Sequence, residues 1–329
     1  MHFSYFRFLL IGCIAMSGLS ATGCGSSDGT AQLDAGMGAM DAENPASGDC
    51  SALPAISSEV EILTHVPDSE DFTFDREGYL VNVQVGTGAL FKTAYDGQPQ
   101  LQVPDVSGFA RGTRVLPNDE LVVVDSGRSG LLRIDETNAV HEVLLGLPNP
   151  NGVTVDMDGL VYVSHAHGEI RRIDPQTGEF AILHSDRLRS FDGIAFSADY
   201  RTLYFNEEEG AILAMAIDAD GNPDEPSLLV ELPVEFLLDG MATDRCGNLY
   251  VVEMAGLIWR VQPDGSAEMV IDIRSHVGNG LIPAVNFGSG KGGWKANALY
   301  IMDFAKRVYE VEVGIESKAE PHLPAPVTD

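Results

Sequence analysis

Acidic, amide and basic side chains recur along this 329-residue chain at nearly regular intervals. The recurring positions are 40 to 47 residues apart, and they are Glu70, Arg111, Asn151, Asp192, Asp239 and Asn286. Three carboxylates and two amide oxygens brought close together repel unless a cation neutralises them, and so many hard oxygen donors suit calcium better than zinc or copper. The pattern therefore predicts a divalent-cation site. The alternative is that each Asp-Gly or Asn-Gly pair only forms a turn.

Each of these positions opens a hairpin of two short strands. Similar segments run from a polar residue through an alternating strand and a glycine-rich turn to a second strand, over 71–83, 151–165, 192–206 and 239–253. A repeat of about 40 to 45 residues with four short strands is typical of one β-propeller blade, whose innermost strand lines a central channel. We therefore predict an all-β, six-bladed β-propeller over residues 50–314, with the recurring side chains converging on one ring.

The two ends of the chain differ from this repeat. Residues 1–23 carry one Arg, an apolar run and then small residues, which is typical of a secretory signal peptide. Ala21-Thr22-Gly23-Cys24 resembles a bacterial lipoprotein processing box, so we expect a lipidated Cys24 and a location in the bacterial cell envelope, with ordinary cleavage near Ala21 as the alternative. Residues 24–49 contain no aromatic residue and are expected to be a flexible tether. Residues 315–329 are expected to form a C-terminal tail.

The cysteines and the net charge indicate the disulfide pairing and the kinds of ligand that the chain can bind. Cys13 leaves with the signal peptide and Cys24 carries the lipid, so Cys50 and Cys246 remain for a disulfide in an oxidising compartment, or stay as two free thiols. The formal net charge of −29, with no cluster of Lys and Arg, disfavours nucleic-acid binding. The same charge makes a divalent-cation site electrostatically favourable.

These residues resemble the SMP-30/gluconolactonase/LRE-like family of six-bladed propellers over about residues 60–313. In that family one calcium or other divalent ion is held by a Glu, two Asn and an Asp from separate blades. The resemblance places these ligands at Glu70 of SEDFTFD, Asn151 of PNGVTVD, Asp192 of FDGIAFS and Asp239 of LDGMATD. This chain has Asp192 where the family has Asn, and Asp71-Phe72 after Glu70 where the family has Gly-Pro or Ser-Pro.

The resemblance implies an exported, divalent-metal-dependent hydrolase that acts on a lactone or related ester. Calcium is the expected ion, with magnesium, manganese and zinc as alternatives. Asp239 is the first choice for the carboxylate that activates water or attacks directly, and Asp192 is the second. Arg111 and Asn286 are expected to contact substrate, although Arg111 is an equally good counter-ion for Glu70 or Asp192.

We expect a monomer that contacts a membrane only through its lipid anchor and binds no nucleic acid. Two other functional classes remain open at this point. One is a non-catalytic propeller that presents its loops to a protein or carbohydrate, and the other is a lyase of the strictosidine synthase-like kind.

Overall fold

The computed structural model describes Cys50 and residues 53–323. The predicted signal peptide, the tether over 24–49 and the lipidation site Cys24 lie outside the described residues. The described part of the chain contains no helix long and apolar enough to cross a membrane. Its helical content is the single turn α1 (Arg274–Val277), which lies in the connection between the fifth and sixth blades.

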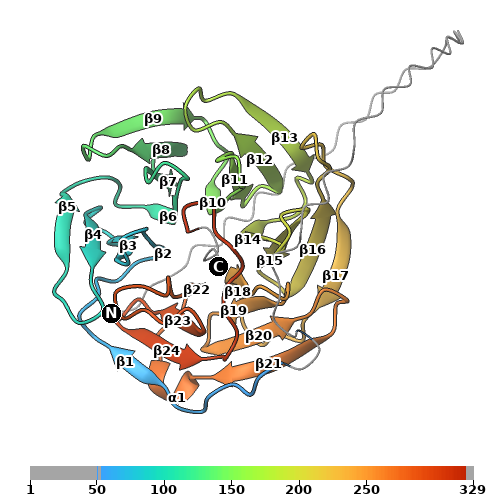
Figure 1. The fold of residues 1–329 in the computed structure, drawn as a ribbon. Coiled ribbons are helices and arrows are strands. Elements are labelled where there is room, and N and C mark those ends of the chain that lie inside the picture. The colour runs from blue at the N-terminus through green and yellow to red at the C-terminus, as the bar shows by residue number, and fades with distance from the viewer. Residues whose placement is uncertain (1–49, 51–52, 324–329) are drawn as a thin grey trace, which may run out of the picture. The chain divides into compact units, whose positions relative to one another are not determined.

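Six four-stranded antiparallel sheets surround a central channel, so the predicted fold class is confirmed (Figure 1). The first five blades each consist of four consecutive strands. Blade 1 comprises β2 (Phe72–Phe74), β3 (Leu80–Val83), β4 (Leu90–Thr93) and β5 (Gln100–Val103); blade 2 comprises β6 (Ala110–Val115), β7 (Leu121–Asp125), β8 (Gly130–Ile134) and β9 (Val140–Leu145); blade 3 comprises β10 (Pro150–Val155), β11 (Val161–His165), β12 (Glu169–Ile173) and β13 (Phe180–Ser185).

The remaining blades complete the ring. Blade 4 comprises β14 (Phe191–Phe196), β15 (Thr202–Glu207), β16 (Ala211–Ala216) and β17 (Ser227–Glu231), and blade 5 comprises β18 (Leu238–Thr243), β19 (Leu249–Glu253), β20 (Leu257–Val261) and β21 (Ala267–Asp272). Blade 6 takes β22 (Ala284–Phe287), β23 (Ala298–Met302) and β24 (Val308–Glu312) from the C-terminal side. Its outermost strand is β1 (Glu61–Leu63), which pairs antiparallel with β24 and so closes the ring.

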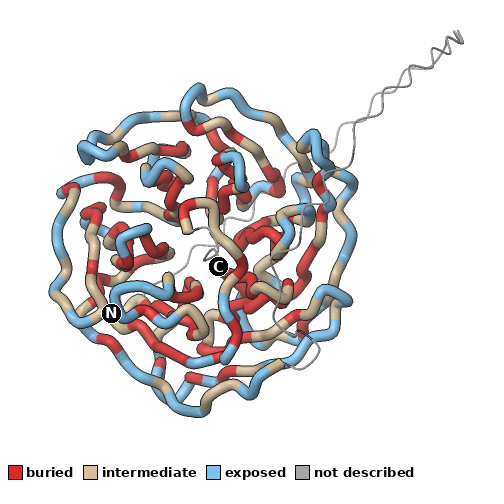
Figure 2. The backbone as a smooth tube through the Cα atoms, viewed as in Figure 1, coloured by how far each residue is buried: buried red, intermediate tan, exposed pale blue. Residues whose placement is uncertain are grey.

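The hydrophobic core is divided among the contacts between neighbouring blades (Figure 2). Strand β7 illustrates the reason, since it is buried at all of its positions. Val123 packs in a cluster with blade 1, whereas Val122 and Val124 pack in a cluster with blade 3. Successive side chains of a strand point to opposite faces, so a strand covered on both faces needs a continuous apolar run such as LVVV. Each such side chain contributes about 1.5–3 kcal/mol on burial.

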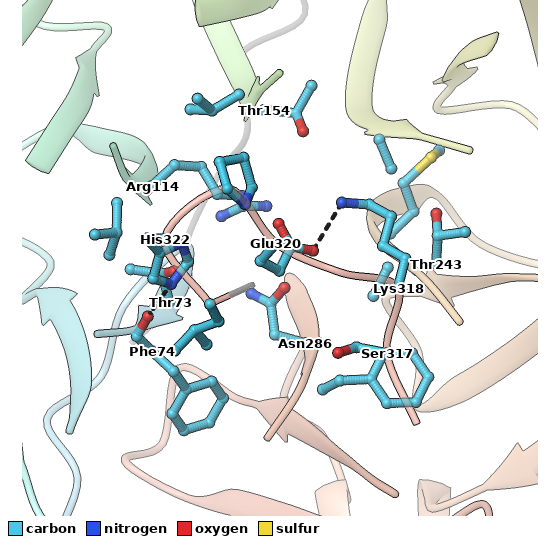
Figure 3. Close-up of a pocket in the computed structure, with 18 of the residues that line it drawn as sticks. Thr73, Phe74, Arg114, Thr154, Thr243, Asn286, Ser317, Lys318, Glu320 and His322 are labelled. Atoms are coloured by element: carbon cyan, nitrogen blue, oxygen red, sulfur yellow. Dashed lines mark hydrogen bonds and ion pairs between the residues drawn. The ribbon is translucent and has the colours of Figure 1, made fainter. Parts of the chain in front are cut away.

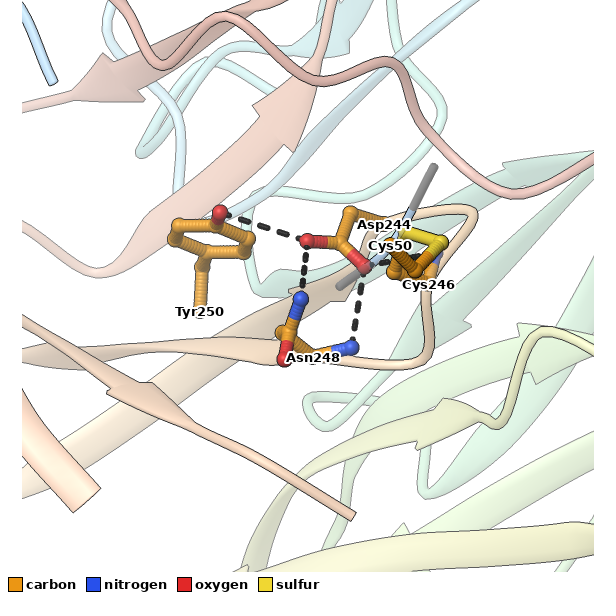
Figure 4. The surroundings of a disulfide bond; sticks show 5 residues. All are labelled: Cys50, Asp244, Cys246, Asn248 and Tyr250. Carbon is orange, nitrogen blue, oxygen red and sulfur yellow. Dashed lines mark hydrogen bonds between the residues drawn. A yellow bond between two sulfur atoms is a disulfide. The ribbon is translucent and has the colours of Figure 1, made fainter. Parts of the chain in front are cut away.

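A disulfide fastens the beginning of the domain to blade 5. Cys50 is joined to Cys246, with their Cα atoms 5.7 Å apart, and Cys246 lies in the turn between β18 and β19 (Figure 4). The buried Asp244 organises this turn by accepting hydrogen bonds from the backbone N–H groups of Cys246 and Asn248, both at 2.9 Å. The bridge ties the segment before β1 to a blade other than the one that β1 completes.

The expected tail over 315–329 is docked on the propeller in its described part. Residues 315–323, here named the C-terminal strap, cross the end of the channel where the inner strands finish (Figures 1 and 3). The Lys318 N–H donates to the Thr243 carbonyl at 3.1 Å, and the His322 ring lies 2.7 Å from the Phe74 carbonyl through Nε2. The strap therefore joins blade 5 to blade 1 and covers a cavity of about 60 Å³.

Candidate functional site

The residues of the predicted ring stand in β-bulges at the starts of the inner strands. In blades 2 to 5 the pairing between the first and second strands shifts register where an X-Gly pair occurs, at Arg111-Gly112, Asn151-Gly152, Asp192-Gly193 and Asp239-Gly240. A bulge bends the strand and re-aims the side chain of the extra residue. In each of blades 2 to 5 the bulge thus turns one polar side chain toward the mouth of the channel.

Close contact between blades explains the glycines. Gly152, Gly193 and Gly240 all have ordinary negative backbone φ and lie within strands, so the turn-former alternative does not describe them. A Cβ at any of the three would fall closer than 3.0 Å to the backbone carbonyl oxygen of Asp192, Asp239 or Pro283, respectively. Glycine is therefore needed because the next blade passes directly against it.

Two buried polar side chains connect these neighbouring strands. Ser164 accepts a 2.9 Å hydrogen bond from the Gly152 N–H and donates its hydroxyl to the Asp192 carbonyl. Asn206 repeats the arrangement one blade later, because it accepts from the Gly193 N–H at 3.0 Å and donates to the Asp239 carbonyl at 2.6 Å. Both side chains are fully buried. They hold the backbones that carry the acidic side chains in fixed relative positions, and the sequence analysis did not identify them.

Five of the six predicted ring residues line one cavity at the channel mouth. The five are Glu70, Arg111, Asn151, Asp192 and Asp239, which come from blades 1 to 5. The cavity has a volume of about 20 Å³, which is room for a single water molecule or ion. The predicted convergence of side chains more than 160 positions apart in sequence is therefore seen for these five.

Asn286 does not join them, and its expected place in the ring is wrong. Strand β22 pairs with β23 in regular register, so blade 6 has no bulge at this point. Asn286 lies opposite Tyr300, deeper along the channel, and donates its side-chain amide to the Phe72 carbonyl at 2.5 Å. It lines the cavity beneath the C-terminal strap, as Figure 3 shows, while Pro283 and Ala284 lie at the mouth.

The carboxylates at the mouth hold protons more strongly than free carboxylates do. Burial raises the pKa of Asp192 to about 8, and the negative charges of Glu208 and Glu70 add to the shift. Burial also raises the pKa of Asp239 well above its usual range, followed by the charges of Asp192 and Glu70. The positive charge of Arg111 opposes both shifts. The cavity is thus short of positive charge when no cation is bound.

Arg111 supplies part of the missing charge. Its guanidinium forms an ion pair with Glu70, so the structure shows the counter-ion role that the sequence left open beside substrate binding. Burial raises the pKa of the Glu70 carboxyl, and the adjacent Arg111 opposes that shift.

Two further groups at the site were missed by the sequence analysis. Glu208, in the turn between β15 and β16, is near enough to raise the pKa of Asp192. Asp71 accepts hydrogen bonds from the Thr113 N–H at 3.0 Å and from the Arg114 guanidinium at 2.5 Å, and so ties the start of blade 1 to blade 2. The run of three acidic residues in FNEEEG was a visible signal for Glu208. In contrast, no local pattern in the sequence indicates that Asp71 pairs with Arg114.

The donor set at the mouth fits a hard divalent cation. Four carboxyl groups, Asp71 included, and one amide oxygen from four blades line the same cavity, and oxygen donors of this kind are the ligands that calcium and magnesium prefer. Within residues 53–323, no three His, Cys, Asp or Glu side chains are arranged closely enough to form a ready-made metal cluster.

Comparison with known proteins agrees with this geometry. Residues 164–279 match the SMP-30/gluconolactonase/LRE-like region. Over this stretch, about a third of its length, the chain is similar to that family. The resemblance predicted from the sequence is therefore confirmed, and the matched stretch includes Asp192 and Asp239, whereas Glu70, Arg111 and Asn151 precede it.

One curated relative is a gluconolactonase of Zymomonas mobilis, which is 25% identical over 186 residues. The alignment spans 47% of this chain and 52% of that protein, so the chain matches about half the length of this relative.

Solved structures share the fold. The gluconolactonase XC5397 of Xanthomonas campestris is 21% identical, with a TM-score of 0.65 over 80% of this chain and 95% of that one. The calcium-binding protein regucalcin of Agrobacterium tumefaciens is 17% identical, with a TM-score of 0.61 over 78% of this chain and 92% of that one. At these identities the likeness establishes the shared propeller fold.

Proposed function

We propose that this chain is a divalent-cation-dependent hydrolase of a lactone or related ester. The observation that carries the proposal is the convergence of Glu70, Asn151, Asp192 and Asp239 on one small cavity at the channel mouth. The similarity to gluconolactonases supports the choice of substrate class. Calcium is the ion that we expect, because the donors are oxygens and the site holds several carboxylates.

These four residues would hold the ion, and a bound divalent cation supplies Lewis acidity that polarises an ester carbonyl and stabilises developing negative charge. Asp239 has the properties of the general base, because burial and the charges of Asp192 and Glu70 raise its pKa and so bring its proton affinity toward the useful range. It takes a proton from the attacking water at a carboxylate oxygen. Asp192 is the second candidate for this role, since its pKa is raised to about 8.

The framework of the site positions these groups. Ser164 and Asn206 hold the Asp192 and Asp239 backbones through buried hydrogen bonds, so the strands that carry the carboxyl groups are in place before a ligand arrives. The C-terminal strap closes the opposite end of the channel, and ligands therefore approach the acidic cavity from the mouth.

Export to the cell envelope through a signal peptide and a lipid on Cys24 forms part of the proposal. The disulfide between Cys50 and Cys246 supports it, because structural disulfides persist mainly in oxidising compartments. We propose a monomer, since every blade in the described chain already has its four strands.

A hydrolysis panel tests the activity. Sugar lactones, aliphatic lactones, aryl esters and organophosphates are incubated with the purified protein in calcium, magnesium, manganese or zinc, next to a chelator-treated sample. We expect hydrolysis of at least one lactone or ester that stops on chelation and returns with calcium. Hydrolysis that is insensitive to chelation would contradict the cation dependence, and no hydrolysis across the panel would contradict the enzymatic function.

A further inference from the structure

Arg111 occupies a ring position where three other blades present an oxygen donor. It stands in the bulge of β6 and is followed by Gly112, as Asn151, Asp192 and Asp239 stand in the bulges of their own strands. The fold therefore delivers a tethered positive charge to the same cavity to which it delivers the carboxylates.

The guanidinium interacts with three of the carboxyl groups that line the cavity. It forms an ion pair with Glu70 and lies close enough to Asp192 and Asp239 for their negative charges to act on it. Arg114, the other arginine that lines the cavity, is instead engaged with Asp71. Among the described residues lining the cavity, Arg111 is thus the basic side chain paired with an expected cation ligand.

The Arg111 side chain is also partly exposed to solvent. It is 41% exposed, compared with 18% for Arg114, and its Nε makes a long, exposed hydrogen bond of 3.4 Å to the Ser126 hydroxyl. A guanidinium and a divalent cation that both contact Glu70 repel each other, because like charges a few ångströms apart interact unfavourably even in water.

We propose that Arg111 is a tethered counter-cation that competes with the divalent cation for Glu70 and moves outward when the cation binds. This inference rests on the proposed function, since it assumes that the cavity binds a divalent cation. Arg111 then sets the cation affinity of the site. In the cation-free protein Arg111 neutralises part of the negative charge of the cavity. When the divalent cation is bound, the guanidinium of Arg111 faces the mouth of the channel.

The test measures calcium affinity by isothermal titration calorimetry on chelator-treated protein. Arg111→Met is compared with wild type and with Arg189→Met. Arg189 is a matched control, because its side chain is 43% exposed and it pairs with Glu207 and Asp186, which are not expected ligands. We expect Arg111→Met to bind calcium at least about tenfold more tightly than wild type. Arg189→Met is expected to match wild type.

Each outcome separates the inference from the proposed function. Calcium binding by Arg111→Met alone, or tighter binding by it, supports the inference. Equal or weaker binding by Arg111→Met overturns the inference and leaves the cation site standing. Absence of binding by both proteins overturns the cation site and the inference together.

A second readout follows the arginine itself in the wild-type protein. Phenylglyoxal modifies accessible guanidinium groups, and the labelled peptides are quantified by mass spectrometry with and without calcium. We expect calcium to increase the labelling rate of Arg111 and to leave that of Arg189 unchanged. A rate for Arg111 that stays constant or falls would show that the guanidinium does not move outward.

Discussion

The side-chain amide of Asn206 in blade 4 donates a 2.6 Å hydrogen bond to the backbone carbonyl of Asp239 in blade 5. The same side chain accepts the Gly193 N–H at 3.0 Å, so one buried asparagine links the two strands that carry Asp192 and Asp239. The relative position of the two strands that carry these carboxyl groups therefore depends on a side chain that does not line the cavity.

Replacing Asn206 with Ala tests this link. The change leaves the Gly193 N–H and the Asp239 carbonyl buried without partners, at a cost of about 1–3 kcal/mol for each group. We expect a matching fall in the free energy of unfolding, measured by urea denaturation, together with weaker calcium binding. Asn118→Ala is the control, because Asn118 is exposed and pairs only with the neighbouring Glu120. Equal stability of the two variants would contradict the linking role.

The glycine after Asp192 provides a second test. In Gly193→Ala the new Cβ collides with the Asp239 carbonyl oxygen, so blades 4 and 5 must separate, and overpacking of this kind costs about 1–3 kcal/mol. Gly108→Ala is the control, since its Cβ would lie 3.5 Å from its nearest neighbour and its φ is also negative. Thermal unfolding should show a lower Tm for Gly193→Ala alone. A Tm equal to that of the control would refute close blade contact as the reason for this glycine.

The raised pKa of Asp192 predicts a pH dependence of stability in cation-free protein. The native carboxyl, with a pKa of about 8, keeps a proton that the unfolded chain releases near its ordinary value of 3.8, so native stability falls as the pH rises between these two values. Asp192→Asn removes this contribution and should flatten the Tm profile measured in chelator. Calcium should restore wild-type stability most at the alkaline end, where the carboxyl is ionised. Parallel profiles for the two proteins would argue against the shifted pKa.

Asp239 and Glu70 are expected to respond differently to neutral substitutions. Asp239→Asn keeps an oxygen donor but removes the proton acceptor, so we expect modestly weaker cation binding and a loss of turnover of about 10²–10⁴-fold. Glu70→Gln should lose activity that excess calcium partly restores. Cation affinity and hydrolysis rate are measured for both variants on the ester that the wild type cleaves. If cation-saturated Asp239→Asn turns over at the wild-type rate, Asp192 takes the role of the base.

The C-terminal strap contains an ion pair that tests its contribution to stability. Lys318 is buried, and its Nζ lies 2.8 Å from Glu320 (Figure 3). The same Nζ lies 2.6 Å from the Tyr200 hydroxyl. Glu320→Gln removes the counter-ion of a buried charge, and we expect a loss of about 3 kcal/mol. Lys318→Met leaves Glu320 partly exposed to water and should cost less. The free energies of unfolding of the two variants are measured at neutral pH. A larger loss for Lys318→Met than for Glu320→Gln would show that Glu320 is not needed to stabilise the buried charge of Lys318.

The sequence alone determined the architecture of this protein. The interval of 40 to 47 residues between similar hairpins predicts six blades, because each hairpin needs two more short strands to complete a sheet. The starts of the inner strands could also be placed, since a polar residue followed by Gly marks them in blades 2 to 5. Spacing and resemblance thus predicted, without any knowledge of contacts, that one ring contains Glu70, Asn151, Asp192 and Asp239.

Tertiary structure decided what spacing cannot encode. Asn286 was misplaced because a bulge sets the register in blades 2 to 5 and is missing from blade 6, and a register shift is visible only in strand pairing. The pairing of Arg111 with Glu70 depends on how far two side chains reach across the channel. The strap over 315–323 is held in place by contacts with blades 1 and 5, and these contacts could not be predicted from its composition. Each of these features depends on residues distant in sequence, whose contacts arise only when the ring closes.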